Sequence, residues 1–299
     1  MSRAAPEGRI PDFLVIGAMK CGTTSLYHDL RQVPGLFLAE KELNALCQPA
    51  PAEVYQEAFR RARPDQLCGE VSPDYAKLPE SANVVTRARM LCAGRTPRIV
   101  YLVREPVSRT RSHHTFVSSQ LGRLNEGMGR QIDQAVRDFP RLIQYSRYAW
   151  QLRPWVSAFG RESLMVVRFE DYVSHRTETL AEILGFLGIN PELTLRSPAI
   201  VRNPTEGRPL VTPGWRRCLD LPFYRRILRP LVSAEMRERF RNWLLPRSQG
   251  RPAAPSLETV DFILSQVAAD AEELRRLLGL DQALWDLKEV RQQYLVSSP

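Results

Sequence analysis

Residues 13–30, FLVIGAMKCGTTSLYHDL, decide how the rest of the chain is interpreted. The stretch begins with the apolar run FLVI, which is too short for a helix and rich in strand-forming residues. Gly17 and Gly22 enclose a short loop, and apolar residues then recur at helical spacing from Leu26 to Leu30. The segment therefore predicts a buried strand, a tight loop and the start of a helix.

Such a loop directs backbone N–H groups and side-chain donors toward one point, where the helix dipole also favours negative charge. Lys20 lies inside this loop, and Thr23, Thr24 and Ser25 follow Gly22 directly. A lysine, hydroxyl groups and N–H groups aimed at one point predict an anion site, with phosphate as its ligand.

The position of the lysine separates two kinds of phosphate loop. Nucleotide triphosphatases have G-x-x-x-x-G-K-[ST], with the lysine after the second glycine. Here Thr23 stands in that place, and Lys20 precedes Gly22. The next strong strand, residues 98–103, is followed by Arg104 rather than by the aspartate that holds magnesium in such enzymes. An arginine there neutralises a phosphate group without a metal.

These features resemble the sulfotransferases that use 3′-phosphoadenosine 5′-phosphosulfate (PAPS), in particular their bacterial and heparan-type branch. In that family a K-x-G-T-[ST] loop holds the 5′-phosphosulfate, and the chain has Lys20-Cys21-Gly22-Thr23-Thr24. An arginine after a central strand and a serine on the next helix hold the 3′-phosphate, and the matching residues are Arg104 and Ser112.

The resemblance implies a set of PAPS-binding residues, and adenosine 3′,5′-bisphosphate as the product. In this family a basic loop folds over the 3′-phosphate, and the comparable stretch here is residues 195–222. The implied set is Lys20, Cys21, Gly22, Thr23, Thr24, Ser25, Arg104, Ser112, Arg202 and Arg208. Cys21 is either a thiol made reactive by Lys20 and the helix N-terminus or a residue that fills the loop.

The catalytic residues implied by the resemblance are Lys20, which stabilises the leaving phosphate, and a general base. Glu42 lies in AEKELN, which resembles the K-E-P-H-F-F segment whose glutamate deprotonates the acceptor. His113, next to His114, is the rival base. The run GEVSPDY resembles the heparan enzymes' E-K-T-P-x-Y, but Val71 replaces the lysine that assists catalysis there.

Strand and helix patterns alternate along the chain, which predicts an α/β fold of three layers with a central parallel sheet. We expect residues 1–9 to be a disordered N-terminus and residues 10–295 to form a single domain with a helical C-terminal region. The predicted strands are 13–16, 37–38, 67–72, 98–103 and 164–169. The predicted helices are 52–62, 80–92, one beginning at Pro106, 141–159, 177–187, 233–245 and 256–280, with a loop at 119–130.

Composition limits the classes of function. The 299 residues include 43% hydrophobic and 25% charged residues, which suits one globular domain. No apolar run approaches the ~20 residues that span a bilayer, and the first residues have no signal-peptide core. We therefore expect a cytoplasmic enzyme. Five cysteines without a C-x-x-C pair predict neither a disulfide framework nor a zinc site, and no metal is required.

The net charge of +9 admits several anionic partners, and a PAPS molecule accounts for part of it. The predicted acceptor is a hydroxyl group of a carbohydrate or small natural product, and no nucleic acid is expected. Aromatic and basic residues at 215–217 and 223–226 either pack in the fold or make a peripheral membrane contact. The alternative function is a P-loop nucleotide kinase or hydrolase; the oligomeric state is not set by the sequence.

Overall fold

A computed structural model of the chain describes residues 8–118, 131–190 and 254–296. Within these residues, five strands form one sheet in the order β2-β3-β1-β4-β5, and every neighbouring pair is parallel. The strands are β1 (Phe13–Gly17), β2 (Leu36–Leu38), β3 (Leu67–Val71), β4 (Arg98–Val103) and β5 (Leu164–Arg168). The predicted parallel sheet is thus confirmed.

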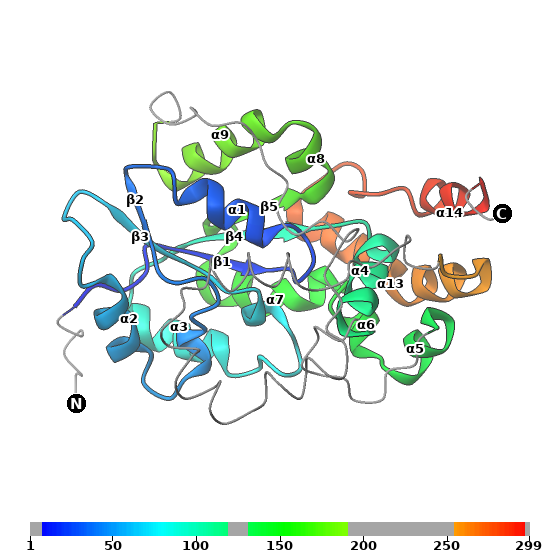
Figure 1. Ribbon diagram of the computed structural model, residues 1–299, viewed down its shortest axis with the longest axis horizontal. Coiled ribbons are helices and arrows are strands. Elements are labelled where there is room, and N and C mark those ends of the chain that lie inside the picture. The colour runs from blue at the N-terminus through cyan, green and yellow to red at the C-terminus, as the bar shows by residue number, and fades with distance from the viewer. Residues whose placement is uncertain (1–7, 119–130, 191–253, 297–299) are drawn as a thin grey trace, which may run out of the picture.

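Helices cover both faces of the sheet, so the molecule has three layers (Figure 1). One layer contains α1 and α9 with the short helix α8, and the other contains α2, α3 and α7. The described helices are α1 (Thr23–Leu30), α2 (Pro51–Phe59), α3 (Val84–Cys92), α4 (Pro106–Ser118), α5 (Ile132–Asp138), α6 (Arg141–Gln144), α7 (Tyr148–Phe159), α8 (Phe169–Ser174), α9 (Arg176–Leu187), α13 (Leu257–Leu278) and α14 (Leu287–Val296).

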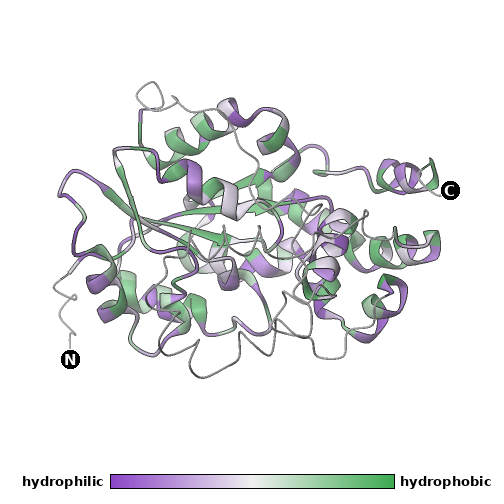
Figure 2. Cartoon of the chain, viewed as in Figure 1, coloured by the Kyte–Doolittle hydropathy of each residue, from purple (hydrophilic) through white to green (hydrophobic). Residues whose placement is uncertain are grey.

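The central strands form the core of the protein. All five residues of β1 are buried, as are the last five of β4. Figure 2 shows these strands as hydrophobic, while hydrophilic residues concentrate on helices and loops. Burial of one such Val, Leu or Ile side chain contributes about 1.5–3 kcal/mol, so a polar substitution in either strand would disrupt the sheet that positions the loops.

Because all strands are parallel, their carboxyl ends meet at one edge of the sheet, where ligands bind in open α/β folds. The loop 18–22 follows β1 at this edge, Ser72 follows β3, and Arg104 follows β4. The N–H of Ala18 donates to the carbonyl of Leu102 at 2.6 Å, which ties the loop after β1 to the end of β4.

The predicted helix 141–159 is wrong, because two helices, α6 and α7, occupy this stretch. A continuous helix would use the carbonyl of Leu142 to accept from the N–H of Ser146. The guanidinium of Arg109 and the hydroxyl of Thr110 bind that carbonyl instead, the latter at 3.2 Å. Asp270 of α13 then accepts from the N–H groups of Ala149 and Trp150, both at 2.9 Å, and so caps α7.

The remaining expectations have mixed outcomes. The predicted strands, and the helices at 52–62, 80–92, 177–187 and 256–280, are confirmed, most of them with shifted ends, whereas α5, α8 and α14 were not predicted. The segments 119–130, 195–222 and 233–245 lie outside the described residues. Arg9, inside the expected loose terminus, donates to the carbonyls of Arg63 and Gln66 at 2.6 and 2.8 Å. No helix within the described ranges is long and apolar enough to cross a membrane.

Candidate active site

The loop after β1 presents the N-terminus of α1 to the carboxyl edge of the sheet. Gly22 is the N-cap of α1, and its carbonyl accepts the first helical bond from the N–H of Leu26 at 3.1 Å. A glycine has no side-chain oxygen with which to cap the first N–H groups, and the first turn of α1 contains no acidic residue. The positive end of the helix dipole is therefore available to an anion.

Two constraints fix glycine at position 22. Its φ is +89°, a left-handed conformation that side chains disfavour. A Cβ atom there would also lie 2.8 Å from the ring of Phe169, which belongs to α8. The loop thus packs directly against the segment that follows β5, and any larger residue would push the two apart.

The structure places the two cationic residues that the sequence predicts to bind opposite ends of one nucleotide on neighbouring loops, after β1 and after β4. The guanidinium of Arg104 donates to the backbone carbonyl of Lys20 at 3.4 Å and lies 4.7 Å from the centre of the Phe169 ring. The hydroxyl of Tyr148 accepts from the N–H of Arg104 at 3.1 Å and donates to its carbonyl at 2.6 Å. Both ends of the Arg104 residue are therefore fixed.

Helix α4 packs beside the loop that carries Lys20. The ammonium group of Lys20 lies 4.5 Å from the centre of the Phe116 ring on α4, a cation–π contact. Ser112, predicted to bind the 3′-phosphate with Arg104, is buried on the same helix. Arg202 and Arg208 lie outside the described residues, so their predicted role stays a prediction.

Of the two interpretations of Cys21, the structure favours the residue that fills the loop over the reactive thiol. The side chain is buried, and its sulfur lies 3.9 Å from the Tyr148 hydroxyl. Burial raises the pKa of the Cys21 thiol to about 12, although Arg109 and Arg104 act in the opposite direction. The thiol is thus protonated at neutral pH, and the side chain fills the space behind the loop.

Glu42, the predicted base, lies at the same edge of the sheet beside β3. Its N–H donates to the carbonyl of Val71, the last residue of β3, at 3.0 Å. Its side chain is half exposed, at 51%, and pairs with the ammonium group of Lys41. Since β3 is hydrogen-bonded to β1, one strand separates the attachment point of Glu42 from the phosphate loop.

Both predicted catalytic residues adopt a strained backbone. Among the described residues other than glycine, positive φ values occur at Lys20 (73°), Glu42 (59°), Asn44 (54°) and Ala93 (43°). Each such conformation costs about 1–3 kcal/mol and persists only where the surrounding contacts impose it. Such strain concentrates at binding and catalytic sites, and Lys20 and Glu42, two of the three predicted catalytic residues, are among these four positions.

His113 is buried on α4 and stacks on Tyr145, with ring centres 5.5 Å apart. Its Nδ1 lies 3.5 Å from a guanidinium nitrogen of Arg109. Because a guanidinium has only donors, Nδ1 is the acceptor and the ring proton lies on Nε2. Burial, followed by the charges of Arg109 and Lys77, holds the pKa of His113 well below its ordinary value. A buried imidazole among cations is a poor proton acceptor, which favours Glu42 as base.

Sequence reasoning missed several residues that shape this site. Glu105 caps α4, since its carboxylate accepts from the N–H groups of Val107 and Ser108 at 2.5 and 2.7 Å. Glu170 in turn accepts from the N–H of Glu105 at 2.8 Å, which joins α8 to α4. A glutamate just before Pro106, at a helix start, was the available signal for the cap.

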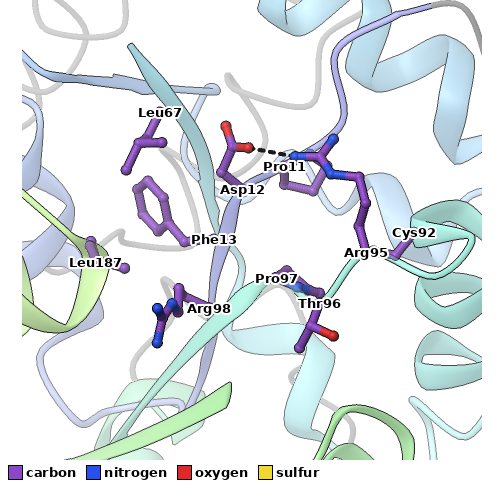
Figure 3. Close-up of a pocket in the computed structure, with 10 residues that line it drawn as sticks. All are labelled: Pro11, Asp12, Phe13, Leu67, Cys92, Arg95, Thr96, Pro97, Arg98 and Leu187. Atoms are coloured by element: carbon purple, nitrogen blue, oxygen red, sulfur yellow. Dashed lines mark hydrogen bonds and ion pairs between the residues drawn. The ribbon is translucent and has the colours of Figure 1, made fainter. Parts of the chain in front are cut away.

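A cavity of about 180 Å³ lies at the opposite, amino edge of the sheet (Figure 3). It is lined by the beginnings of β1, β3 and β4, and an ion pair between Asp12 and Arg95 of 2.7 Å crosses one side. None of the predicted site residues lines it. The ion pair involves Asp12 and Arg95, and the guanidinium of Arg98 lies 5.3 Å from the centre of the Phe186 ring.

Comparison with known proteins places this geometry in a family. Residues 10–202, more than half of the chain, match the model of the sulfotransferase domain. The chain belongs to the sulfotransferase domain family. The resemblance predicted from the loop 20–24 and Arg104 is therefore confirmed, and the matched residues run from β1 to beyond α9.

Individual sulfotransferases show the extent of the similarity. Human carbohydrate sulfotransferase 15 is 23% identical, over 74% of this chain and 51% of that protein. Mouse heparan sulfate glucosamine 3-O-sulfotransferase 3B1 is 25% identical, over 64% of this chain and 49% of that protein. The chain spans about half the length of these curated relatives. A sulfotransferase structure from Alicyclobacillus acidocaldarius shares the fold, with 20% identity, a TM-score of 0.57 and coverage of 92% of this chain and 98% of that one.

Proposed function

We propose that this protein transfers the sulfuryl group of PAPS to a hydroxyl group of a carbohydrate. Family membership supports sulfuryl transfer, and the names of the curated relatives, which act on carbohydrates and on heparan sulfate glucosamine, support the class of acceptor. The observation that carries the proposal is the contact between Arg104 and the carbonyl of Lys20, because it joins the two loops whose cationic residues are assigned to one nucleotide.

The donor groups present fit a highly anionic nucleotide. The N-terminus of α1, Lys20 and Arg104 contribute positive charge, while Thr23 and Thr24 add hydroxyl groups at the first turn. Bound PAPS supplies the sulfuryl group and leaves as adenosine 3′,5′-bisphosphate. In this proposal Lys20 offsets the charge that develops on the 5′-phosphate, and Arg104 with Ser112 holds the 3′-phosphate. Magnesium has no assigned task in this arrangement.

Glu42 is the proposed general base. Its carboxylate is exposed at the carboxyl edge of the sheet and accepts the proton of the acceptor hydroxyl as the oxygen attacks sulfur. The half-exposed position suits a residue that must meet a saccharide arriving from solvent. His113 is buried and its Nδ1 faces the guanidinium of Arg109, so it is assigned a packing role instead of proton removal.

The test is transfer of labelled sulfate from PAPS to a panel of saccharides. Desulfated heparan and chondroitin chains and simple glycosides would be compared, with and without a magnesium chelator. Label in a saccharide product, unchanged by the chelator and lost in Glu42→Gln, supports the proposal. If the protein instead released phosphate from ATP only in the presence of magnesium and transferred nothing from PAPS, the nucleotide kinase or hydrolase alternative would be favoured.

A further inference from the structure

A buried carboxylate lies directly beneath the segment that carries Glu42. Glu70, in the middle of the sheet on β3, is completely buried. Its Oε2 accepts from the hydroxyls of Tyr55 at 2.5 Å and Tyr75 at 2.7 Å, and its Oε1 accepts from the hydroxyl of Ser72 at 2.5 Å. In the described part of the chain no Lys or Arg nitrogen lies within ion-pair distance of it. Three hydroxyl protons stabilise this carboxylate.

Two of these hydroxyls also hold the backbone just after Glu42. The oxygen of Ser72 accepts from the N–H of Asn44 at 3.2 Å. The oxygen of Tyr75 accepts from the N–H of Leu46 at 3.0 Å. Together with the bond from the Glu42 N–H to Val71, these contacts attach residues 42–46 to the end of β3 at three points.

The direction of the hydroxyl protons makes the carboxylate necessary. A hydroxyl has one proton, and an ionised carboxylate can only accept hydrogen bonds. Because Ser72 and Tyr75 give their protons to Glu70, their oxygen lone pairs face the N–H groups of Asn44 and Leu46. A glutamine at position 70 would present an NH₂ group to one side of this network, and that hydroxyl would have to turn its proton elsewhere.

The segment needs such support because two of its residues are in the left-handed conformation. The φ values are 59° at Glu42 and 54° at Asn44. Conformations of this kind persist only where surrounding contacts over-determine them. We propose that Glu70 is a positioning residue, which acts through Ser72 and Tyr75 to hold the backbone of Glu42 in the geometry that proton removal requires. This inference rests on the proposed function for the role of Glu42.

Tyr55 provides a matched control within the same cluster. Its hydroxyl donates to the same Glu70 oxygen as that of Tyr75, and the two hydroxyls are 3.4 Å apart. It makes no hydrogen bond to residues 42–46 in the described structure. Tyr55→Phe therefore removes one donor to the buried carboxylate without removing a contact to the segment of Glu42.

The experiment compares Tyr75→Phe, Ser72→Ala, Glu70→Gln and Tyr55→Phe in the full chain, with Glu42 intact and with Glu42→Gln. Hydrogen exchange of the Asn44 and Leu46 amides is measured first, since it requires no substrate. We expect Tyr75→Phe, Ser72→Ala and Glu70→Gln to speed exchange at these amides at least 10-fold, and Tyr55→Phe to leave it unchanged at equal thermal stability. Unchanged exchange in Glu70→Gln, unchanged exchange in Tyr75→Phe and Ser72→Ala, or equal acceleration in Tyr55→Phe would each overturn the inference.

Turnover then separates this inference from the proposed function. With Glu42 intact, Tyr75→Phe and Ser72→Ala should lower kcat about 10- to 100-fold, since small misplacements of a reacting group have effects of this size, with unchanged affinity for adenosine 3′,5′-bisphosphate. With Glu42→Gln, the same substitutions should lower kcat no further. Independent, multiplying losses in both backgrounds would contradict action through Glu42. Absence of any transfer by the wild-type protein would contradict the proposed function, while the exchange result would still decide whether the Glu70 network holds this segment.

Discussion

The guanidinium of Arg104 lies 3.4 Å from the carbonyl oxygen of Lys20, although 84 positions separate the two residues in the sequence. This contact joins the end of β4 to the loop after β1, which are neighbours in the sheet. It fixes the guanidinium of Arg104 against the backbone of the loop that leads into α1.

Removal of either cation should weaken binding of adenosine 3′,5′-bisphosphate. Lys20→Ala and Arg104→Ala should each raise the Kd about 10- to 100-fold, which corresponds to one hydrogen bond to a charged group. Arg104→Lys should recover part of the loss, because a lysine restores charge without a planar fork. Arg95→Ala, on the opposite edge of the sheet, serves as the control. Equal affinities of all four variants, measured by calorimetry, would refute a shared nucleotide site.

Substitution of Glu42 should separate catalysis from stability. Glu42→Gln should lower kcat about 10²- to 10⁴-fold, the usual contribution of a general base, and leave nucleotide affinity unchanged.

Glu42→Gly and Glu42→Ala both lack the carboxylate, but glycine accepts the φ of 59° at this position. Glu42→Gly should therefore be more stable than Glu42→Ala by about 1 kcal/mol. Denaturant unfolding measures this difference, and the reverse order would contradict the left-handed backbone.

The lowered pKa of His113 makes the free energy of unfolding depend on pH. Burial holds its pKa well below the ordinary value of 6.5, so the folded protein keeps the ring neutral while the unfolded chain takes up a proton. The unfolded state thus binds more protons below about pH 6.5, and stability falls as the pH falls.

From pH 7 to pH 5.5 this single group removes about 1 kcal/mol of unfolding free energy. His113→Gln should lose less stability than the wild type over the same interval, since glutamine does not titrate. His175, which is exposed on the surface between α8 and α9, provides the control in His175→Gln. Parallel pH profiles of wild type and His113→Gln would show that the ring titrates alike in the folded and unfolded states, which would contradict a lowered pKa.

The cysteines predict a pattern of alkylation. Burial raises the pKa of Cys21 to about 12, and partial burial also raises the pKa of Cys47, but Cys47 is accessible to reagent because it is exposed on the surface. Iodoacetamide at pH 8 should label Cys47 in the folded protein and leave Cys21 unmodified until the chain is unfolded in denaturant. Peptide mapping by mass spectrometry reads both sites. Fast modification of Cys21 in the folded protein would contradict the packing behind the loop.

Local patterns were sufficient for the fold and for the family, while the nucleotide-binding role of each residue stays a prediction. The apolar run before Gly17 and the run at 98–103 are each β-strands, and the parallel sheet follows from strands that alternate with helices. The loop 18–22 and Arg104 were recognisable because their residue types are dictated by phosphate chemistry. These features depend on neighbours in the sequence, which a single chain displays.

Features set by contacts between distant segments were not predictable. The interruption between α6 and α7 arises because Arg109 takes the carbonyl of Leu142, and nothing near residue 142 reveals that contact. The burial of Cys21 beneath Tyr148 likewise joins residues 127 positions apart. The network around Glu70 was hidden for the same reason, since Tyr55 reaches it from α2. Such tertiary hydrogen bonds override local propensity.

The most direct test of the account is a calorimetric titration of the full chain with adenosine 3′,5′-bisphosphate in the presence of a magnesium chelator, beside an identical titration with ADP. We expect the bisphosphate to bind without metal and at least 10-fold more tightly than ADP. Arg104→Ala should lose this preference. Binding that requires magnesium, or equal affinity for the two nucleotides, would contradict the claim that Lys20 and Arg104 hold the two ends of one PAPS molecule.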